Sequence, residues 1–322
     1  MKKKVLIIGP IGDYGGRDIE VNIIAKALEN KFSTKILSTG YMTKESFSLS
    51  KLKNTTWTSV DKIIYDSNPF IRVISKISKR YNSGDKLSYG YVNNSLSKKY
   101  NLKKLYLEVL KRELLEADLV ILCVQLTTKY IKEIIDYCYN HNKFIFLRTT
   151  GTIKHIDVSK FDYLNKVNKF IHHSERNAEN LNMQMKLAYT VIDQCALTEN
   201  KLLNTLTKPS KSLRYGFLGR LSSEKGILEL ASYFSFTSKP FVIAGDGPLK
   251  DSLLPIINEN NNFEYLGLID NNNIEFFFSK IDVLIISSYE ESGPLVGLEA
   301  MAAGKIIIST KVGAMEDRLL NN

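Results

Sequence analysis

Short runs of apolar residues alternate along the chain with longer stretches in which apolar positions have a helical spacing. The runs are continuous and rich in β-branched residues, which is typical of parallel strands covered by helices on both faces. In the first half of the chain, this alternation predicts a parallel, doubly wound α/β sheet. The expected strands are 5–8, 34–37, 119–124, 144–147 and 170–172, and the expected helices are 18–29, one that ends near 116, and 128–140.

The second half of the chain repeats the pattern, with strands expected near 213–217, 241–244, 263–266, 283–286 and 306–308. A chain of 322 residues is longer than one hydrophobic core usually supports. The segment from Asn200 to Ser212 is polar and is interrupted by Pro209, so it is the best boundary. We predict an N-terminal domain over 1–199, a linker over 200–212 and a C-terminal domain over 213–322.

Charge is spread unevenly along the chain. The residues from Arg72 to Arg112 include eleven Lys or Arg against two acidic residues, which is +9 of the formal net charge of +10. Within this stretch Pro69 begins an expected helix with an apolar face and a basic face. The apolar face is formed by Phe70, Val73, Ile74, Ile77 and Tyr81, and the basic face by Arg72, Lys76, Lys79 and Arg80.

This basic stretch has three interpretations. A basic amphipathic helix is typical of proteins that lie on an anionic membrane surface, so these four basic residues are candidate membrane-binding residues. Alternatively, the helix packs on the sheet with its lysines in water. Nucleic-acid binding ranks last, because nothing in the sequence matches a nucleic-acid module, and we predict no nucleic-acid partner.

Other features of the sequence bear on its location. No stretch approaches the roughly 18–20 apolar residues of a membrane span, and the amino terminus is too short and Gly-broken for a signal peptide. The cysteines are odd in number and lie in apolar surroundings: Cys123, Cys138 and Cys195. We expect a cytoplasmic, reduced protein without a metal site, placed at the inner face of the cell membrane if the membrane interpretation holds.

Residues 282–309 carry the most informative chemistry. A buried-looking strand is followed by a turn and a short helix, for which Pro294 fits the first position and Gly304 the position just past the end. The helix then begins at the carboxyl end of a strand, where open α/β sheets bind ligands, and its free N–H groups would face an anion such as a phosphate. Glu291 and Glu299 would border this pocket, where their carboxylates can bind hydroxyl groups.

Three further segments have the same order and spacing as motifs of a known family. Residues 219–226 read GRLSSEKG, residues 244–249 read AGDGPL and residues 311–317 read KVGAMED. Together with the segment above, they resemble the nucleotide-binding half of retaining glycosyltransferases of the GT-B fold, and the chain is similar to glycosyltransferase family 4. The resemblance implies two Rossmann-like domains that face each other across a cleft.

The resemblance implies a role for each matched residue. Arg220 and Lys225 would stabilise the leaving diphosphate, Glu291 would contact the donor sugar and the reacting centre, and Glu299 would accept hydrogen bonds from the ribose. No metal or other cofactor is then required. Backbone close to the donor would come from Gly15, Gly16, Gly219, Gly245, Gly247, Gly293 and Leu295. Pro294 has no N–H, so the contact after Glu291 must come from Gly293 or Leu295.

The loop after the first strand, residues 9–17, has two other interpretations. It could be a plain tight turn, and a dinucleotide-binding loop is the obvious rival. Its glycines do not give G-x-G-x-x-G, however, and no acidic residue ends the second strand.

The sequence departs from the family in three places. Arg148 to Gly151 stand where the family often has a histidine that meets the donor sugar, and His155 could substitute for it. Val191 to Cys195 replace the usual Asn-Gly before the linker. Only Met315 to Asn322 follow the last matched motif, so the C-terminal part is expected to be truncated.

The resulting expectation is a retaining glycosyltransferase that moves a sugar from a nucleoside-diphosphate sugar to a cell-surface polysaccharide or glycolipid precursor. Its partners would be that donor and a glycan or lipid-linked acceptor. Two alternatives remain open: another GT-B nucleotide-sugar enzyme such as an epimerase, and an inactive family member that serves as a membrane-associated assembly partner. The sequence does not choose between uridine and guanosine donors.

Overall fold

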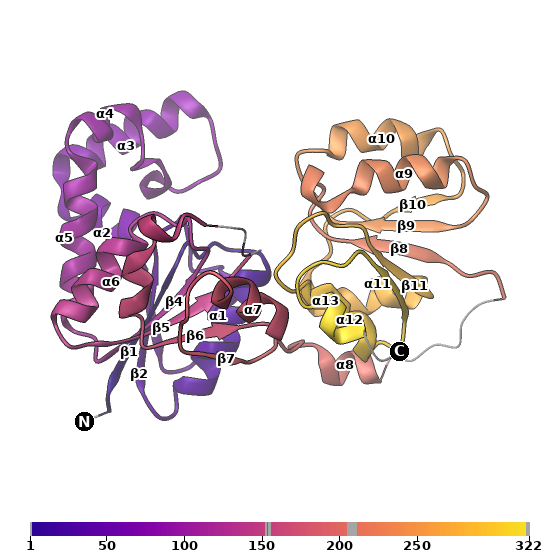
Figure 1. Ribbon diagram of the computed structural model, residues 1–322. Helices are drawn as coiled ribbons and strands as arrows, with labels where there is room; N and C mark the ends of the chain where they lie inside the picture. Colours follow the sequence, from indigo (N-terminus) through magenta and orange to yellow (C-terminus); the bar gives the residue numbers. More distant parts are fainter. Residues whose placement is uncertain (1, 152, 154–155, 205–210, 320–322) are drawn as a thin grey trace. The chain divides into compact units, whose positions relative to one another are not determined.

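The computed structural model describes residues 2–319 except 152, 154–155 and 205–210. It forms two compact units (Figure 1). Unit 1 comprises residues 1–172 and 178–191, and unit 2 comprises residues 173–177 and 192–322. The predicted linker, 200–212, contains the end of a short helix, α8 (Glu199–Leu203), and includes residues 205–210, which lie outside the described part of the chain.

Unit 1 is built on a seven-stranded parallel sheet with the order β3-β2-β1-β4-β5-β6-β7. The order reverses between β1 and β4, as in doubly wound folds. The strands are β1 (Lys4–Gly9), β2 (Ser33–Ser38), β3 (Thr55–Ser59), β4 (Leu119–Val124), β5 (Phe144–Thr149), β6 (Lys169–His172) and β7 (Tyr189–Val191).

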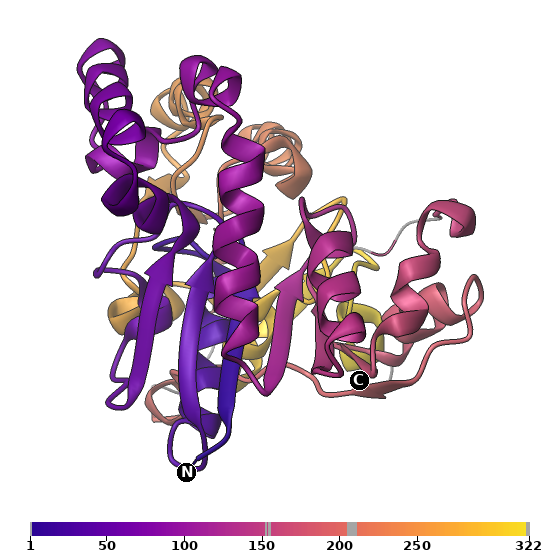
Figure 2. The same ribbon diagram turned by 90° about the vertical axis from the view of Figure 1, so that its left-hand side faces the viewer.

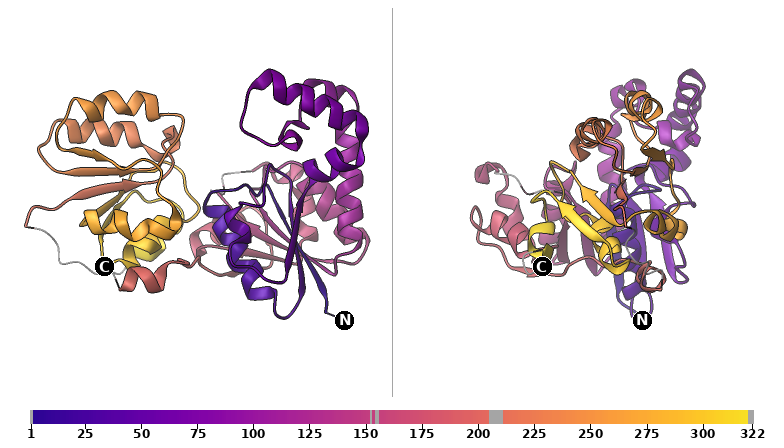
Figure 3. Two further views of the ribbon diagram at one scale, coloured as in Figure 1. Left: turned by 180° about the vertical axis from the view of Figure 1, so that it is seen from behind. Right: turned by 90° about the vertical axis from the view of Figure 1, so that its right-hand side faces the viewer.

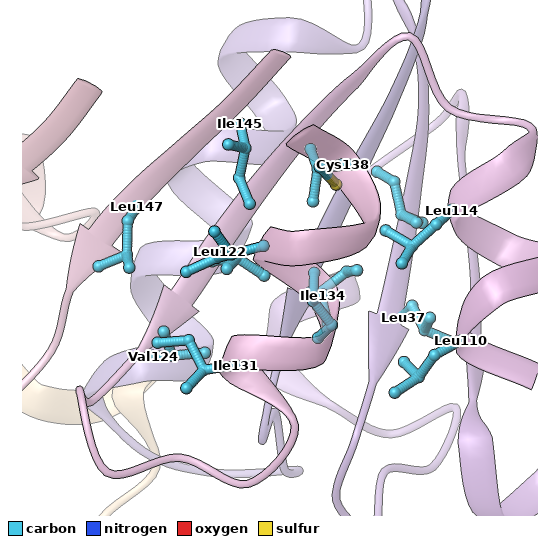
Figure 4. Close-up of a cluster of buried hydrophobic side chains, with 14 of the residues drawn as sticks. Leu37, Leu110, Leu114, Leu122, Val124, Ile131, Ile134, Cys138, Ile145 and Leu147 are labelled. Carbon is cyan, nitrogen blue, oxygen red and sulfur yellow. The ribbon is translucent and has the colours of Figure 1, made fainter. Parts of the chain in front are cut away.

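Helices cover both faces of this sheet because successive strand residues point to opposite sides. Val5 and Ile7 of β1 belong to the cluster that packs against α1 (Gly16–Leu28). Leu6 and Ile8 belong to the opposite cluster, which is covered by α2 (Val60–Ser67), α5 (Leu102–Leu115) and α6 (Ile131–Asn140). Figure 2 views unit 1 from the side on which α5 crosses in front of the strands. Figure 4 shows side chains of α5 and α6 packed against β4 and β5.

The other helices of the first half are α3 (Pro69–Asn82), α4 (Ser95–Lys99) and α7 (Glu175–Asn182), and the short 3₁₀ turns are Phe47–Leu49, Ser88–Tyr91, Val158–Lys160 and Asp162–Lys166.

Unit 2 has a five-stranded parallel sheet with the order β10-β9-β8-β11-β12. The strands are β8 (Tyr215–Leu218), β9 (Phe241–Ala244), β10 (Phe263–Tyr265), β11 (Val283–Ile286) and β12 (Ile306–Ser309). One face packs against α9 (Ile227–Ser235) and α10 (Lys250–Asn258). The other packs against α8, α11 (Ile274–Lys280), α12 (Leu295–Ala302) and α13 (Met315–Leu319). Figure 3 shows these two layers from behind. Two 3₁₀ turns, Ser223–Lys225 and Asn271–Asn273, complete the unit.

The predicted strands and their parallel arrangement are confirmed, within one or two residues at the ends. Two edge strands were not predicted. β3 has a polar sequence, TTWTS, and β7 has only three residues, so neither has the long apolar run that identifies a buried strand.

Helix α3 forms as expected, but the side it buries differs from the predicted apolar face. Its buried residues are Ile71, Ile74 and Ser75. Of the predicted face only Ile74 is buried, and the other four are 47% to 85% exposed: Phe70, Val73, Ile77 and Tyr81. Contacts with α2 and the 88–91 turn fix which side faces inward, and a helical wheel does not contain that information. No helix among the described residues is long and apolar enough to cross a membrane.

Candidate functional site

The predicted site residues of unit 2 lie in loops at the carboxyl edge of its sheet, except Leu295 and Glu299, which lie in α12. The strand order reverses between β8 and β11, so the loops after these two strands diverge there, and open α/β sheets bind ligands at such a point. Arg220 and Lys225 belong to the loop after β8, and Glu291 belongs to the loop after β11. Loops after β9 and β12 lie at the same edge, because all five strands are parallel.

The loops after β8 and β11 are joined by direct contacts. The Lys225 ammonium group pairs with Glu291 Oε1, although the two residues are 66 positions apart. Ser288 Oγ donates to the same carboxylate oxygen at 3.2 Å. Ser287 Oγ donates to the carbonyl of Lys225 at 2.8 Å, so side chain and backbone both hold the loops together. Both partners of the ion pair keep part of their surface in water, with the Lys225 side chain 23% and the Glu291 side chain 17% exposed.

Glu299 is the unusual group of the site. It lies in α12, is 5% exposed, and burial raises the pKa of its carboxyl to about 7. Among the described residues, no hydrogen-bond donor or cation reaches this carboxyl. A buried carboxylate without donors costs free energy, so burial holds much of this group protonated near neutral pH. A ligand that brings hydroxyl donors would stabilise its ionised form.

Helix α12 begins one residue later than predicted. Pro294 has an extended ψ of 116° and is the N-cap, so Leu295 is the first helical residue. The N–H groups of the first turn have no intrahelical acceptor, and they point out of the helix at its positive dipole end. At the other end Gly304 has a φ of 63°, as predicted for the position after the helix.

The loop before α12 is fastened by residues that the sequence analysis did not single out. Asn177 Nδ2 donates to the carbonyl of Ser292 at 3.1 Å. Arg318 Nη1 donates to the carbonyl of Pro294 at 3.0 Å, and Arg318 Nη2 donates to Asp193 Oδ1 at 2.6 Å. A Cβ atom on Gly293 would stand 2.9 Å from the Gln194 side chain. The Asn177–Ser292 and Arg318–Asp193 contacts join positions 115 and 125 residues apart, for which the sequence carries no local signal.

The turn after β9 requires glycine. Gly245 has a φ of 137°, and a Cβ atom there would stand 1.8 Å from the carbonyl oxygen of Gly219. A Cβ atom on Gly247 would stand 2.5 Å from the carbonyl oxygen of Leu221. The loops after β8 and β9 therefore pack backbone against backbone, which keeps the backbone beside Arg220 in place. The Arg220 side chain itself is exposed.

The remaining predicted residues belong to unit 1. Gly15 and Gly16 are exposed at the start of α1, where Gly15 is the N-cap with a φ of 154°. The adjoining loop is closed by Asp18, which accepts a hydrogen bond from the Gly12 N–H at 2.8 Å. Burial raises the pKa of the Asp18 carboxyl.

The position where a histidine was expected is taken by a buried ion pair. Arg148 pairs with Glu20 of α1, and its Nη1 donates to the carbonyl of His172 at 3.0 Å. Burial lowers the pKa of His172 to about 4. His155, the suggested substitute, lies outside the described residues. No group of three or more His, Cys, Asp or Glu side chains in the described part of the chain could hold a metal ion.

Comparison with solved structures identifies the fold. The two parallel α/β units have the GT-B fold: HepE of Anabaena, solved with UDP and glucose, matches 98% of this chain and 82% of its own with a TM-score of 0.65 and 16% identity. A lipopolysaccharide outer core galactosyltransferase, WaaB, matches 97% of this chain and 81% of its own with a TM-score of 0.58 and 15% identity.

Residues 199–322 match the family model described as glycosyl transferases group 1. The chain is also similar to the uncharacterized glycosyltransferase MJ1607 of Methanocaldococcus jannaschii, with 30% identity over 106 residues. The match covers 31% of this chain and 27% of that relative, so the similarity in sequence concerns about a quarter of the relative's length.

Proposed function

We propose that the chain is a glycosyltransferase that binds a nucleoside-diphosphate sugar at the carboxyl edge of the unit 2 sheet. The observation that carries this proposal is the buried Glu299 carboxyl without donors, which a ribose with two hydroxyl groups would satisfy. The group 1 domain and the UDP bound in the HepE structure support a nucleotide-sugar as the ligand.

The diphosphate is proposed to lie between the first turn of α12 and the loop after β8. The N–H groups at the start of α12 suit its negative charge, with Leu295 as the first of them. Gly293, just before the helix, and the glycine turn at 245–247 allow the backbone to come close to the phosphates and ribose. Arg220 and Lys225 supply two cations for the charge that develops on the leaving oxygen. These groups supply the electrostatic stabilisation that other enzymes obtain from a metal ion, so we propose a metal-independent reaction.

Donor binding rearranges the Lys225–Glu291 pair in this proposal. Lys225 turns its ammonium group toward the phosphate, and the released Glu291 carboxylate accepts a hydrogen bond from a hydroxyl of the donor sugar. Since both side chains are partly exposed, separating them requires little desolvation. The pair thus neutralises the empty site and supplies both charges when the donor arrives.

We further propose that the reaction retains the anomeric configuration. The acceptor hydroxyl attacks on the face from which the diphosphate leaves, its oxygen forms the new bond to the anomeric carbon, and its proton passes to the departing phosphate oxygen. This route needs no separate general base. NMR of the product formed from an α-linked donor tests it: an α-linked product supports retention, and a β-linked product contradicts it.

The proposed acceptor is a cell-surface polysaccharide or glycolipid precursor at the cytoplasmic face of the membrane. The exposed apolar residues of α3 favour membrane contact, since Phe70, Val73, Ile77 and Tyr81 lie beside the exposed cations Lys76 and Arg80. WaaB, a lipopolysaccharide galactosyltransferase of the same fold, supports such an acceptor. Gly15 and Gly16, at the exposed start of α1, are kept as proposed donor-binding residues.

Vesicle sedimentation tests the membrane contact. Binding should require anionic lipid, weaken with salt, and fall in the variant V73S/I77S. The control is L115S, which removes an exposed apolar side chain at the end of α5 without changing the charge and should behave like the parent protein. Equal binding to neutral and anionic vesicles, or binding to neither, would contradict the electrostatic contact with an anionic membrane surface.

Calorimetric titration with UDP and with GDP tests the donor site. Glu299→Gln keeps the shape of the side chain but loses the negative charge, so affinity for the nucleotide that binds should fall about tenfold to a hundredfold. The control is Glu290→Gln, an exposed neighbour of Glu291, which should bind like the parent protein. Undiminished nucleotide binding by the Glu299→Gln protein would contradict the site.

Epimerase activity is separated from transfer by the product. Incubation of the sugar nucleotide alone gives an isomeric sugar from an epimerase, whereas a transferase gives free nucleotide only when an acceptor or water accepts the sugar. An inactive assembly partner would give neither.

A further inference from the structure

Unit 1 has a cavity of its own, of about 480 Å³, at the carboxyl edge of its sheet. Pro10 and Thr39 directly follow β1 and β2, and Thr128 follows β4 by four residues. The cavity therefore lies beside the reversal of strand order between β1 and β4, where open α/β sheets bind ligands.

Three lysines from three different elements line this cavity. Lys98 belongs to α4, Lys103 belongs to the first turn of α5, and Lys129 precedes α6. No acidic residue lines the cavity. Within the described residues, none of the three forms an ion pair, whereas nearby Lys104 pairs with Glu108. The cavity thus collects positive charge that this part of the chain does not neutralise.

The helices around the cavity add to its positive potential. Helix α5 has 14 residues, no acidic residue in its first turn, and an N-cap, Asn101, whose side chain makes no capping hydrogen bond. Helix α6 has 10 residues and begins after Tyr130, but Glu133 in its first turn offsets its positive end. Leu102 lines the cavity, so the positive end of α5, which has no such acid, borders the three lysines.

Aromatic side chains form another part of the lining. The rings of Tyr106 and Tyr130 stack with centroids 5.5 Å apart. The Tyr106 hydroxyl donates to Asp61, whose carboxyl is buried and does not line the cavity. The lining therefore combines cations for an anion with flat apolar surface for a ring such as a sugar.

We infer that this cavity binds a phosphate-type group of the acceptor, so that the acceptor is a phosphate-bearing glycan or glycolipid. This inference rests on the proposed function, because it assumes that unit 1 receives the acceptor while unit 2 holds the donor. Phosphate fits better than a neutral sugar, because a neutral acceptor would bring no negative charge to balance the three lysines and the positive end of α5.

Calorimetric titration with inorganic pyrophosphate tests the inference, in the presence of a saturating concentration of the nucleotide, UDP or GDP, that binds unit 2. The test variant is K98Q/K103Q/K129Q. The control is K99Q/K104Q/K111Q, which removes the same charge from α4 and α5 at positions that do not line the cavity. All six lysines are exposed, so both variants should fold.

Pyrophosphate affinity should fall about tenfold in the test variant and less than about twofold in the control, since each exposed charge contact contributes modestly. Equal losses in both variants would show general charge attraction only and would overturn the inference, as would the absence of pyrophosphate binding. Titration of the same proteins with UDP and GDP separates the two claims. If UDP or GDP binds and pyrophosphate affinity is the same in all three proteins, only the cavity is misassigned. If neither nucleotide binds, the proposed function fails.

The source of the phosphate is distinguished with vesicles of phosphatidylcholine that contain phosphatidic acid. Loss of vesicle binding in the test variant but not in the control would indicate a lipid-borne phosphate. Loss of pyrophosphate binding alone would indicate a phosphate on a water-soluble glycan.

Discussion

Replacing Glu299 by Gln should make the protein more stable at high pH while it weakens nucleotide binding. Burial raises the pKa of this carboxyl from its usual 4.5 to about 7. In the unfolded chain the carboxyl loses its proton near pH 4.5, whereas in the folded protein it keeps the proton until about pH 7. The folded state therefore loses stability as the pH rises through this range.

The size of the effect follows from the shift. A difference between 4.5 and about 7 corresponds to about 3 kcal/mol, which is an upper value because the surrounding structure relaxes around the charge. The penalty is absent below pH 4.5 and complete above pH 7. A Gln at this position does not titrate, so the penalty disappears in the variant.

Urea unfolding of both proteins at pH 4.5 and pH 8 measures the effect. The difference in free energy of unfolding, variant minus parent, should be up to about 3 kcal/mol more positive at pH 8 than at pH 4.5. Comparing two pH values cancels the constant effect of replacing a carboxyl by an amide. The exposed Glu290→Gln variant should show no such change. A difference that does not vary with pH would refute the assignment of Glu299 as a buried, donor-free carboxyl.

Three further substitutions probe other parts of the account. Lys225→Ala should lower the rate of sugar transfer about a hundredfold or more, because one of two cations at the leaving group is lost, while the urea midpoint changes little; a transfer rate like that of the parent protein would remove Lys225 from the site. Gly245→Ala should destabilise unit 2 by about 3 kcal/mol or more, since its Cβ would overlap a backbone carbonyl. The control is Gly267→Ala, where φ is 68° but the Cβ would meet open space, and its free energy of unfolding should fall by only about 1 kcal/mol in the same urea assay. Equal losses in the two variants would contradict the packing argument. Arg148→Met should lower the free energy of unfolding by about 3–5 kcal/mol, because Glu20 then remains charged and buried without this partner. Adding Glu20→Gln should restore much of this stability. If the double variant is no more stable than the single one, the broken ion pair is not the cause of the destabilisation.

The central strands could be predicted from sequence because their residues carry the signal themselves. Residues 119–124, 241–244 and 283–286 are apolar throughout, and the structure forms strands with those same bounds. The edge strands β3 and β7 have no such run, because an edge strand needs apolar residues at fewer positions and gains its place by pairing with a neighbour.

The candidate site was predictable where it depends on local geometry. Glycines after β8 and β9 and the helix after β11 follow from turn and helix signals close together in the chain. The contacts that fix the site were not predictable in this way. Arg318 with Asp193 and Asn177 with Ser292 join distant segments, and the burial of Glu299 depends on how α12 packs on the sheet.

The inward face of α3 illustrates the same limit. A helical wheel shows which residues could form one face, but neighbouring elements decide which face is buried. Ser75 is fully buried while Tyr81 is exposed, the reverse of their hydrophobicity. Packing against α2 and the 88–91 turn selects the side, and the exposed apolar residues that remain are the ones proposed to meet a membrane.

Calorimetric titration with UDP and GDP at pH 7, in two buffers with different heats of ionisation, tests the central claim most directly. If ribose hydroxyls stabilise the ionised form of Glu299, binding should release about half a proton, which appears as a difference in heat between the buffers. The account predicts that one nucleotide binds with this proton release and that Glu299→Gln abolishes the release and weakens binding. Binding of neither nucleotide, or proton release that is unchanged in the variant, would contradict it.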